Sequence, residues 1–170
     1  MGGRTEGDGA LPEHQRRVRK SGKMNGVHPC SHEVLIPAGK GRSMCVDCGL
    51  DPEAPVVGIR SMRTGAVMLC ELADRPTAWS RGLSYRPHIG SGRGMLFDLR
   101  SSRVACFQCW FMRFPIDITA MCRDGIVRRV LPSCRPGRLH PIFLGWHIRY
   151  VLETPAGGFP ATPGDVIKIG

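Results

Sequence analysis

Residues 106–131, CFQCWFMRFPIDITAMCRDGIVRRVL, carry the strongest indication of the fold. Polar and apolar side chains alternate from residue 116 to 122, which is the period expected of a strand with one buried face. Asp124-Gly125 can adopt the positive φ angles of a tight hairpin turn, so residues 126–131 are predicted to form the returning strand. Pro132 is expected to end this strand, because proline has no N–H for a ladder.

The rest of the chain is also predicted to consist of short elements. Its 170 residues include 14 prolines and 22 glycines, which favour turns and strands over long helices. One short helix is expected after Asp74, a suitable N-cap, because Pro76 is tolerated in a first turn. Residues 135–146, rich in proline and glycine, are predicted to be irregular. Further strands are predicted at residues 56–62, 66–73, 94–97, 148–154 and 166–169.

Composition divides the chain into three parts. Residues 1–27 are polar and aperiodic and are predicted to be a disordered basic tail. Residues 28–55 hold closely spaced cysteines and histidines with a linker, and residues 56–170 hold the predicted strands. No run approaches the roughly 18 apolar residues of a membrane span, and the N-terminal residues lack the apolar core of a signal peptide. We therefore expect a cytoplasmic protein with no membrane span.

Residues 28–55 are predicted to contain a small zinc knuckle. The C-x-x-C spacing lets two thiolates bind one ion, and Gly49 permits the turn that follows. A closed set of four ligands leaves no open position, so the single zinc ion would be structural. The alternative is a reduced segment without metal, whose cysteines lie near one another by chance. The predicted ligands are Cys30, His32, Cys45 and Cys48, with His28 as the alternative to His32.

The formal net charge is +10, and nearly all of the excess is arginine. Arginine forks suit phosphate, which points to nucleic acid or another polyanion as the partner. A basic run in the tail could contact phosphates without reading sequence. The alternative is that these charges lie on a solvated face and reflect the base composition of the gene. The predicted nucleic-acid-binding residues are Arg16, Arg17, Arg19 and Lys20.

Four motifs follow one another in residues 67–170. They are ELADRPTAWSRGL (71–83), GRGMLF (92–97), FMRFPIDITAMCRDGIV (111–127) and YVLETPAGGFPATPGDVIKI (150–169). In this order they resemble the domain of unknown function 192 family, the uncharacterised ACR family. The resemblance implies a mainly β (α+β) fold, a compact, partly closed, barrel-like antiparallel or mixed sheet with one or two short helices. It implies no established activity, and the knuckle lies outside it.

The sequence departs from the family pattern before the third motif. Gln108 and Cys109 stand where relatives carry a histidine and a threonine. Chemistry that depends on this histidine is therefore not expected. Cys106 and Cys109 form a second C-x-x-C, but positions i and i+3 of a strand face opposite ways, so they chelate poorly unless a bulge or turn intervenes. The remaining thiols are interpreted as packed in the core; they are Cys70, Cys122 and Cys134.

Asp117 is a lone acid in an apolar strand, and a buried charge is costly unless it is paired. If the strands are neighbours, Asp117, Glu153 and Arg113 would converge at one end of the sheet. Two carboxylates there could bind a cation or act as acid and base. The alternative is that Asp117 accepts backbone or arginine hydrogen bonds and fixes the fold.

We therefore predict a non-enzymatic accessory or binding domain with a structural zinc site and with nucleic acid as the partner. The alternative is an enzyme or small-ligand binder that uses a cleft formed by Asp117, Glu153 and Arg113. A third interpretation is a subunit of a larger assembly.

Overall fold

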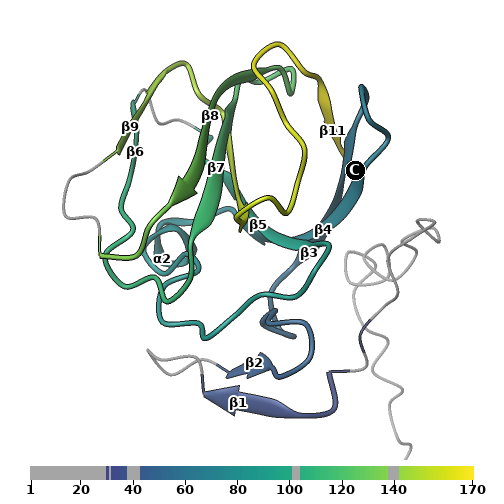
Figure 1. The fold of residues 1–170 in the computed structure, drawn as a ribbon, viewed down its shortest axis with the longest axis vertical. Helices are drawn as coiled ribbons and strands as arrows, with labels where there is room; N and C mark the ends of the chain where they lie inside the picture. Colours follow the sequence, from purple (N-terminus) through teal and green to yellow (C-terminus); the bar gives the residue numbers. More distant parts are fainter. Residues whose placement is uncertain (1–29, 31, 38–42, 101–103, 138–141) are drawn as a thin grey trace, which may run out of the picture.

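Seven strands of the computed structural model form one sheet. They are β3 (Val56–Ser61), β4 (Val67–Ala73), β5 (Arg93–Asp98), β7 (Ile116–Met121), β8 (Val127–Cys134), β10 (Tyr150–Pro155) and β11 (Ile167–Ile169). Their order is β11-β3-β4-β5-β10-β7-β8, and all neighbours are antiparallel except β4 and β5. The sheet curls into a half-barrel (Figure 1). The predicted mainly β, partly closed, barrel-like fold is thus confirmed.

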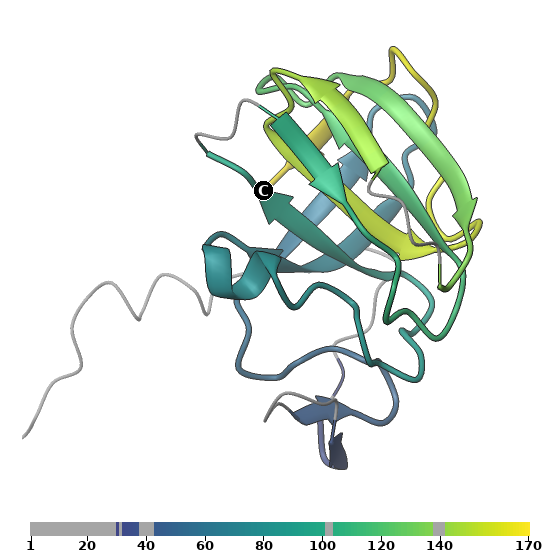
Figure 2. The ribbon, with the colours of Figure 1, turned by 90° about the vertical axis from the view of Figure 1, so that its left-hand side faces the viewer.

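Smaller elements surround this sheet in the described residues, which are 30, 32–37, 43–100, 104–137 and 142–170. The helix α2 (Pro76–Trp79) lies in the connection from β4 to β5. Two antiparallel ribbons pair β1 (Leu35–Pro37) with β2 (Ser43–Cys45), and β6 (Val104–Phe107) with β9 (Ile142–Trp146). We call β1, β2 and the turn through Leu50 the knuckle; it lies below the sheet in Figures 1 and 2. Within the described ranges, no helix has the length and apolar character needed to cross a membrane.

The two faces of the sheet pack against separate hydrophobic clusters. Phe97 and Val151 belong to the first cluster, whereas their chain neighbours Leu96 and Leu152 belong to the second. This division follows from the alternation of side chains along a strand. The first cluster also includes knuckle residues, among them Leu50. The knuckle therefore shares its hydrophobic core with the sheet.

The two edges of the sheet meet at the hairpin between β7 and β8. An isolated antiparallel bridge joins Ile126 to Val166, and the N–H of Ile167 donates to the carbonyl oxygen of Gly125 at 2.9 Å. This contact joins the start of β8 to the start of β11. It explains why the barrel-like sheet is partly closed.

Three local predictions are wrong. β8 continues through Pro132 to Cys134, because an edge strand carries no ladder on its outer side and tolerates proline. Residues 142–146 form β9, where irregular structure was expected. The N-cap of α2 is Arg75, which makes no side-chain cap, rather than Asp74.

We predict that Gly125→Ala destabilises the protein through the closing contact. Gly125 has a φ of +75°, and a Cβ there would overlap the carbonyl oxygen of Ile167. Gly65→Ala is the matched control, because Gly65 has a φ of +72° with nothing within 4 Å of its Cβ position. In both variants the free energy of unfolding should fall by about 1–2 kcal/mol, because alanine is disfavoured in the left-handed backbone conformation. In Gly125→Ala it should fall by about 1–3 kcal/mol more, because the added Cβ overpacks the closing contact. Urea unfolding measures the difference, and equal losses would contradict the closure.

Candidate metal centre

Four side chains converge at the knuckle. Their ligand atoms all lie within 4.8 Å of one another, and the residues are Cys30, His32, Cys45 and Cys48. Cys30 Sγ lies 3.4 Å from Cys45 Sγ, and Cys48 Sγ lies 3.5 Å from His32 Nδ1. Two thiolates bound to one tetrahedral zinc ion at about 2.3 Å lie about 3.8 Å apart, so the group is close to the geometry of a bound site. The four side chains could therefore hold a metal ion.

The backbone of the knuckle brings the two ligand pairs, Cys30 with His32 and Cys45 with Cys48, together. β1 and β2 pair with Leu35 opposite Cys45, which places the N-terminal ligands beside the C-x-x-C turn. The N–H of Gly49 closes this turn on the carbonyl oxygen of Cys45 at 2.9 Å. Gly49 has a φ of +71°, and a Cβ there would lie 2.7 Å from the His88 carbonyl oxygen. Both the turn and its close packing on the loop after α2 thus require glycine.

The two thiols of the C-x-x-C turn differ in acidity. Burial raises the pKa of Cys45, but hydrogen bonds from the N–H groups of Cys48 and Asp47 and from the neighbouring Cys30 and His32 outweigh it, and the pKa falls to about 7. Burial, assisted by the neighbouring thiols, raises the pKa of Cys48 to about 11. The group thus favours a thiolate at Cys45 near neutral pH, and a divalent cation would displace the remaining thiol protons.

A buried ion pair connects the knuckle to the sheet. Arg86 Nη1 and Nη2 donate to the two carboxylate oxygens of Glu71 at 2.5 and 2.7 Å, and the two residues are 0% and 2% exposed. Arg86 Nη1 also donates to the carbonyl oxygen of Gly49 at 2.6 Å, and the N–H of Asp51 donates to Glu71. Gly49, which follows the ligand Cys48, is therefore hydrogen-bonded to the ion pair to which β4 contributes Glu71.

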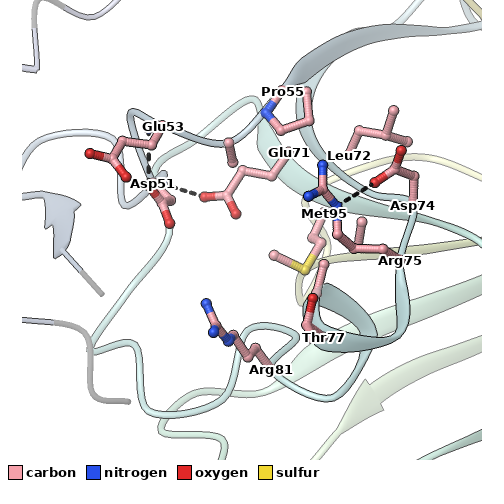
Figure 3. Close-up of a pocket in the computed structure, with 13 residues that line it drawn as sticks. Asp51, Glu53, Pro55, Glu71, Leu72, Asp74, Arg75, Thr77, Arg81 and Met95 are labelled. Atoms are coloured by element: carbon pink, nitrogen blue, oxygen red, sulfur yellow. Dashed lines mark hydrogen bonds and ion pairs between the residues drawn. The ribbon is translucent and has the colours of Figure 1, made fainter. Parts of the chain in front are cut away.

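A charged cavity of about 310 Å³ lies beside this ion pair, between the linker that follows the knuckle, β4 and α2 (Figure 3). Glu71 and Met95 line it from the sheet, and Arg75, paired with Asp74 at 3.3 Å, lines it from the start of α2. Its lining residues include no thiol and no imidazole. The chemistry it offers is therefore ionic contact and hydrogen bonding.

The predicted cleft of Asp117, Glu153 and Arg113 is wrong, because the two acids face opposite sides of the sheet. Asp117 is paired with Thr154 in the register of β7 and β10, whereas Glu153 is paired with Ile118. Successive side chains of a strand point to opposite faces, so the two carboxylates lie on different sides. Arg113 is exposed in the segment before β7.

The carboxylate of Asp117 holds two neighbouring chain segments. One oxygen accepts the N–H of Ser133, near the end of β8, at 2.8 Å. The other accepts the N–H of Gly157, in the loop after β10, also at 2.8 Å. This is the alternative role considered for Asp117, in which the carboxylate fixes the fold.

Glu153 is buried on the face of the first cluster, with 4% of its surface exposed. Burial raises its pKa to about 7, although a hydrogen bond from the Leu83 N–H and the charge of Arg86 act in the opposite direction. Its Oε2 has no hydrogen-bond partner within the described part of the chain. The carboxyl group therefore titrates near neutral pH.

Some predicted residues lie outside the described residues, and some important residues were not predicted. Arg16, Arg17, Arg19 and Lys20 lie in residues 1–29, as does His28, and so fall outside the described ranges. Glu71 is a lone acid between apolar residues of β4, which is the same signal that drew attention to Asp117. Arg86 lies in a loop, and no spacing or periodicity around it indicates a buried partner.

Comparisons with known proteins agree with this fold. A model of the DUF192 family, described as Uncharacterized ACR, matches residues 59–169. A solved structure from Sinorhizobium meliloti 1021, suggested to be a transcription regulator, is 26% identical with a TM-score of 0.64 and covers 68% of this chain and 95% of its own. A protein of unknown function from Novosphingobium aromaticivorans DSM 12444 is 21% identical with a TM-score of 0.61 and covers 84% and 99%. The second likeness shows the fold alone. A search of curated proteins finds no match.

We predict that Glu153→Gln stabilises the protein at alkaline pH. Because the folded-state pKa of Glu153, about 7, lies above its ordinary value of 4.5, the stability that its proton contributes is full below about pH 4.5 and is lost as pH rises through about 7. Glutamine mimics the protonated form, so the variant should match the wild type near pH 4.5 and exceed it by up to about 3 kcal/mol above pH 7. Urea unfolding across this pH range measures the effect.

The matched control for Glu153→Gln is Glu53→Gln, which removes the same charge at an exposed position. Its difference from the wild type should not grow between pH 4.5 and 8. A Glu153→Gln difference that stays constant over the same range would contradict the raised pKa.

Proposed function

The chain belongs to the DUF192 family over residues 59–169, and we propose that it is a non-enzymatic binding protein whose knuckle holds one structural zinc ion and whose partner is nucleic acid. The observation that carries the metal site is the approach of four ligand atoms to within 4.8 Å of one another. The partner is inferred from charge and requires its own test.

Zinc fits the chemistry of the four ligands. Three thiols and one imidazole are soft or borderline donors, which favour zinc over magnesium or calcium. The set fills a tetrahedral ion without leaving a position for substrate, which is typical of structural zinc. The two ribbon strands are only three residues each, so the knuckle has few contacts of its own and depends on its ligands and on the sheet for order.

Surface arginines support a polyanionic partner. The edge strand β8 carries exposed Arg128 and Arg129, exposed Arg123 lies in the turn between β7 and β8, and exposed Arg135 directly follows β8. With the net charge of +10, these side chains add to the basic tail as contacts for phosphate. The S. meliloti structure of the same fold, suggested to be a transcription regulator, makes nucleic acid the first partner to test.

The proposal assigns a role to each part of the chain. Residues 1–27 are a basic tail, residues 28–55 a zinc knuckle and linker, and residues 56–170 the β domain. We place the protein in the cytoplasm, where a reducing environment keeps unpaired thiols available to bind metal.

We predict that Cys45→Ser/Cys48→Ser lowers the zinc content of the purified protein by one equivalent. The two thiolates are half of the ligand set, and a site reduced to one thiol and one imidazole loses most of its affinity. Elemental analysis of protein purified under reducing conditions measures the zinc content.

The matched control for the knuckle variant is Cys70→Ser, which removes a fully buried thiol from the second hydrophobic cluster. Its zinc content should equal that of the wild type. Equal zinc content in the wild type and in Cys45→Ser/Cys48→Ser would remove the knuckle as a zinc site.

We predict that the wild type binds nucleic acid at low salt and that its affinity falls steeply as salt rises. Each phosphate contact contributes roughly −0.9 to the slope of log K against log[salt] for duplex DNA. Arg16→Gln/Arg17→Gln should therefore flatten the slope by up to about 2. Fluorescence anisotropy with labelled duplex and single-stranded oligonucleotides measures both quantities.

The control for the tail variant is Arg75→Gln/Arg100→Gln, which removes two exposed arginines already paired with Asp74. Because a neighbouring carboxylate offsets their charge, the slope should change less than in the tail variant. No binding by the wild type at low salt would eliminate nucleic acid as the partner.

A further inference from the structure

Two aromatic side chains are exposed in the segment between β6 and β7. Trp110 is 44% exposed and Phe111 is 51% exposed, whereas their chain neighbours Cys109 and Met112 are buried in the first hydrophobic cluster. The N–H of Met112 donates to the carbonyl oxygen of Cys109 at 3.5 Å, so a turn closes around the two exposed residues. Because both ends of this turn are anchored in the core, the two aromatic rings are held at the surface.

Phe111 is also supported by the loop after α2. Its ring stacks on the ring of Tyr85, with centroids 4.8 Å apart and an interplanar angle of 16°. The N–H of Tyr85 donates to the carbonyl oxygen of Phe111 at 2.8 Å. Tyr85 has a φ of +69°, a left-handed conformation that is disfavoured for a bulky side chain. The loop thus takes up a strained backbone at the residue that supports Phe111, and half of Phe111 still faces solvent.

The turn that follows β8 lies beside these aromatic residues. The N–H of Gly137 donates to the carbonyl oxygen of Cys109, the residue immediately before Trp110, at 3.0 Å. A cavity of about 520 Å³ is lined by residues 131–137 and so includes this turn. Ile116, the first residue of β7, is paired with Cys134, the last residue of β8. The segment before β7 and the segment after β8 therefore leave the sheet at the same end.

This end of the sheet is positively charged. Arg113 lies in the first of these segments and Arg135 in the second, and both are exposed. Residues 109–116 and 131–137 contain no acidic residue, so no carboxylate within them offsets the two charges. Guanidinium groups pair with phosphate, and aromatic rings stack on bases. The combination matches a single strand of nucleic acid, which offers both groups, and not a duplex, whose bases are already stacked on one another.

We propose that this end of the sheet binds single-stranded nucleic acid, an inference that rests on the proposed function and specifies its partner. We call it the aromatic surface; it consists of Trp110, Phe111, Arg113, Arg135 and the cavity lined by residues 131–137. Bases stack on the two aromatic rings, and the arginines contact the phosphates that join them. Because every base has an aromatic face, this binding is tolerant of sequence.

Fluorescence anisotropy with labelled oligothymidylate tests the aromatic surface in the full chain. The wild type should bind the single strand more tightly than the same strand paired with oligodeoxyadenylate at equal salt concentration. Trp110→Ala/Phe111→Ala should weaken single-strand binding at least about tenfold, because each stacked base contributes a factor of roughly 5 or more. The slope of log K against log[salt] should stay unchanged in this variant, because no charge is removed.

The matched control is Trp146→Ala, which removes another exposed tryptophan. Trp146 is 63% exposed and is paired with Val104, at the opposite end of the β6–β9 ribbon from Phe107 and the turn that follows it. Its affinity for oligothymidylate should equal that of the wild type. Trp110→Phe keeps an aromatic ring and should retain most of the affinity, which separates stacking from a defect in folding.

A measurement on the wild type requires no variant. Unlabelled oligothymidylate should quench the tryptophan fluorescence of the protein, because a base stacks on Trp110. Binding without quenching would overturn the aromatic surface. So would equal affinities of the wild type and Trp110→Ala/Phe111→Ala, or tighter binding of the duplex. A dimer that this double variant abolishes, with oligothymidylate binding intact, would overturn it by assigning the surface to a second copy of the chain.

Failure of the proposed function would appear differently. A wild type that binds neither the single strand nor the duplex at low salt would eliminate nucleic acid as the partner, and the aromatic surface with it. Binding that depends on the tail arginines and not on the aromatic residues would retain the proposed function and overturn the aromatic surface alone.

Discussion

The buried pair of Arg86 and Glu71 is the interaction on which the position of the knuckle depends. Desolvating two charges costs several kcal/mol per ion unless the remaining hydrogen-bonding groups find partners. Glu71 accepts hydrogen bonds from Nη1 and Nη2 of Arg86 and from the N–H of Asp51, and Arg86 also donates to the carbonyl oxygen of Gly49. Two of these partners belong to the knuckle and its linker. The ion pair therefore keeps these two partners only when the knuckle lies against the sheet.

This dependence links metal binding to the stability of the β domain. Cys45 and Cys48 belong to the first hydrophobic cluster, and the carbonyl oxygen of Cys48 accepts the N–H of Gly90 at 2.9 Å. A ligand that binds the folded state alone stabilises it by mass action. A metal ion in the knuckle would thus stabilise the loop after α2 and the pair of Arg86 and Glu71 as well as the knuckle itself. The knuckle lies outside the family match, yet it covers a face of the sheet that would otherwise expose apolar side chains.

The sequence predicts features that depend on local patterns and fails where pairing between strands decides. Alternation from residue 116 to 122 and the Asp124-Gly125 turn correctly place β7 and the hairpin, because both are local. The separation of Asp117 from Glu153 depends on the register of β7 against β10, in which a shift of one residue exchanges the faces. No local pattern contains that register. The role of Arg86 was not predicted for a related reason, because its partner Glu71 is fifteen residues away on a strand. The convergence of the four cysteine and histidine side chains could be predicted, because ligand spacing is itself a local pattern.

Three carboxylates of this domain are engaged in contacts that hold the fold together. Asp117 holds two backbone N–H groups, and Glu71 holds Arg86. Asp165 pairs with Arg63 at 2.6 Å, and this hydrogen bond lowers the pKa of Asp165 to about 2, well below the range useful for proton transfer. A general base needs a lone pair that faces substrate, and these three acids direct their oxygens at the protein itself. Glu153 differs from these three acids, because its pKa is raised to about 7 by burial and its Oε2 has no hydrogen-bond partner among the described residues.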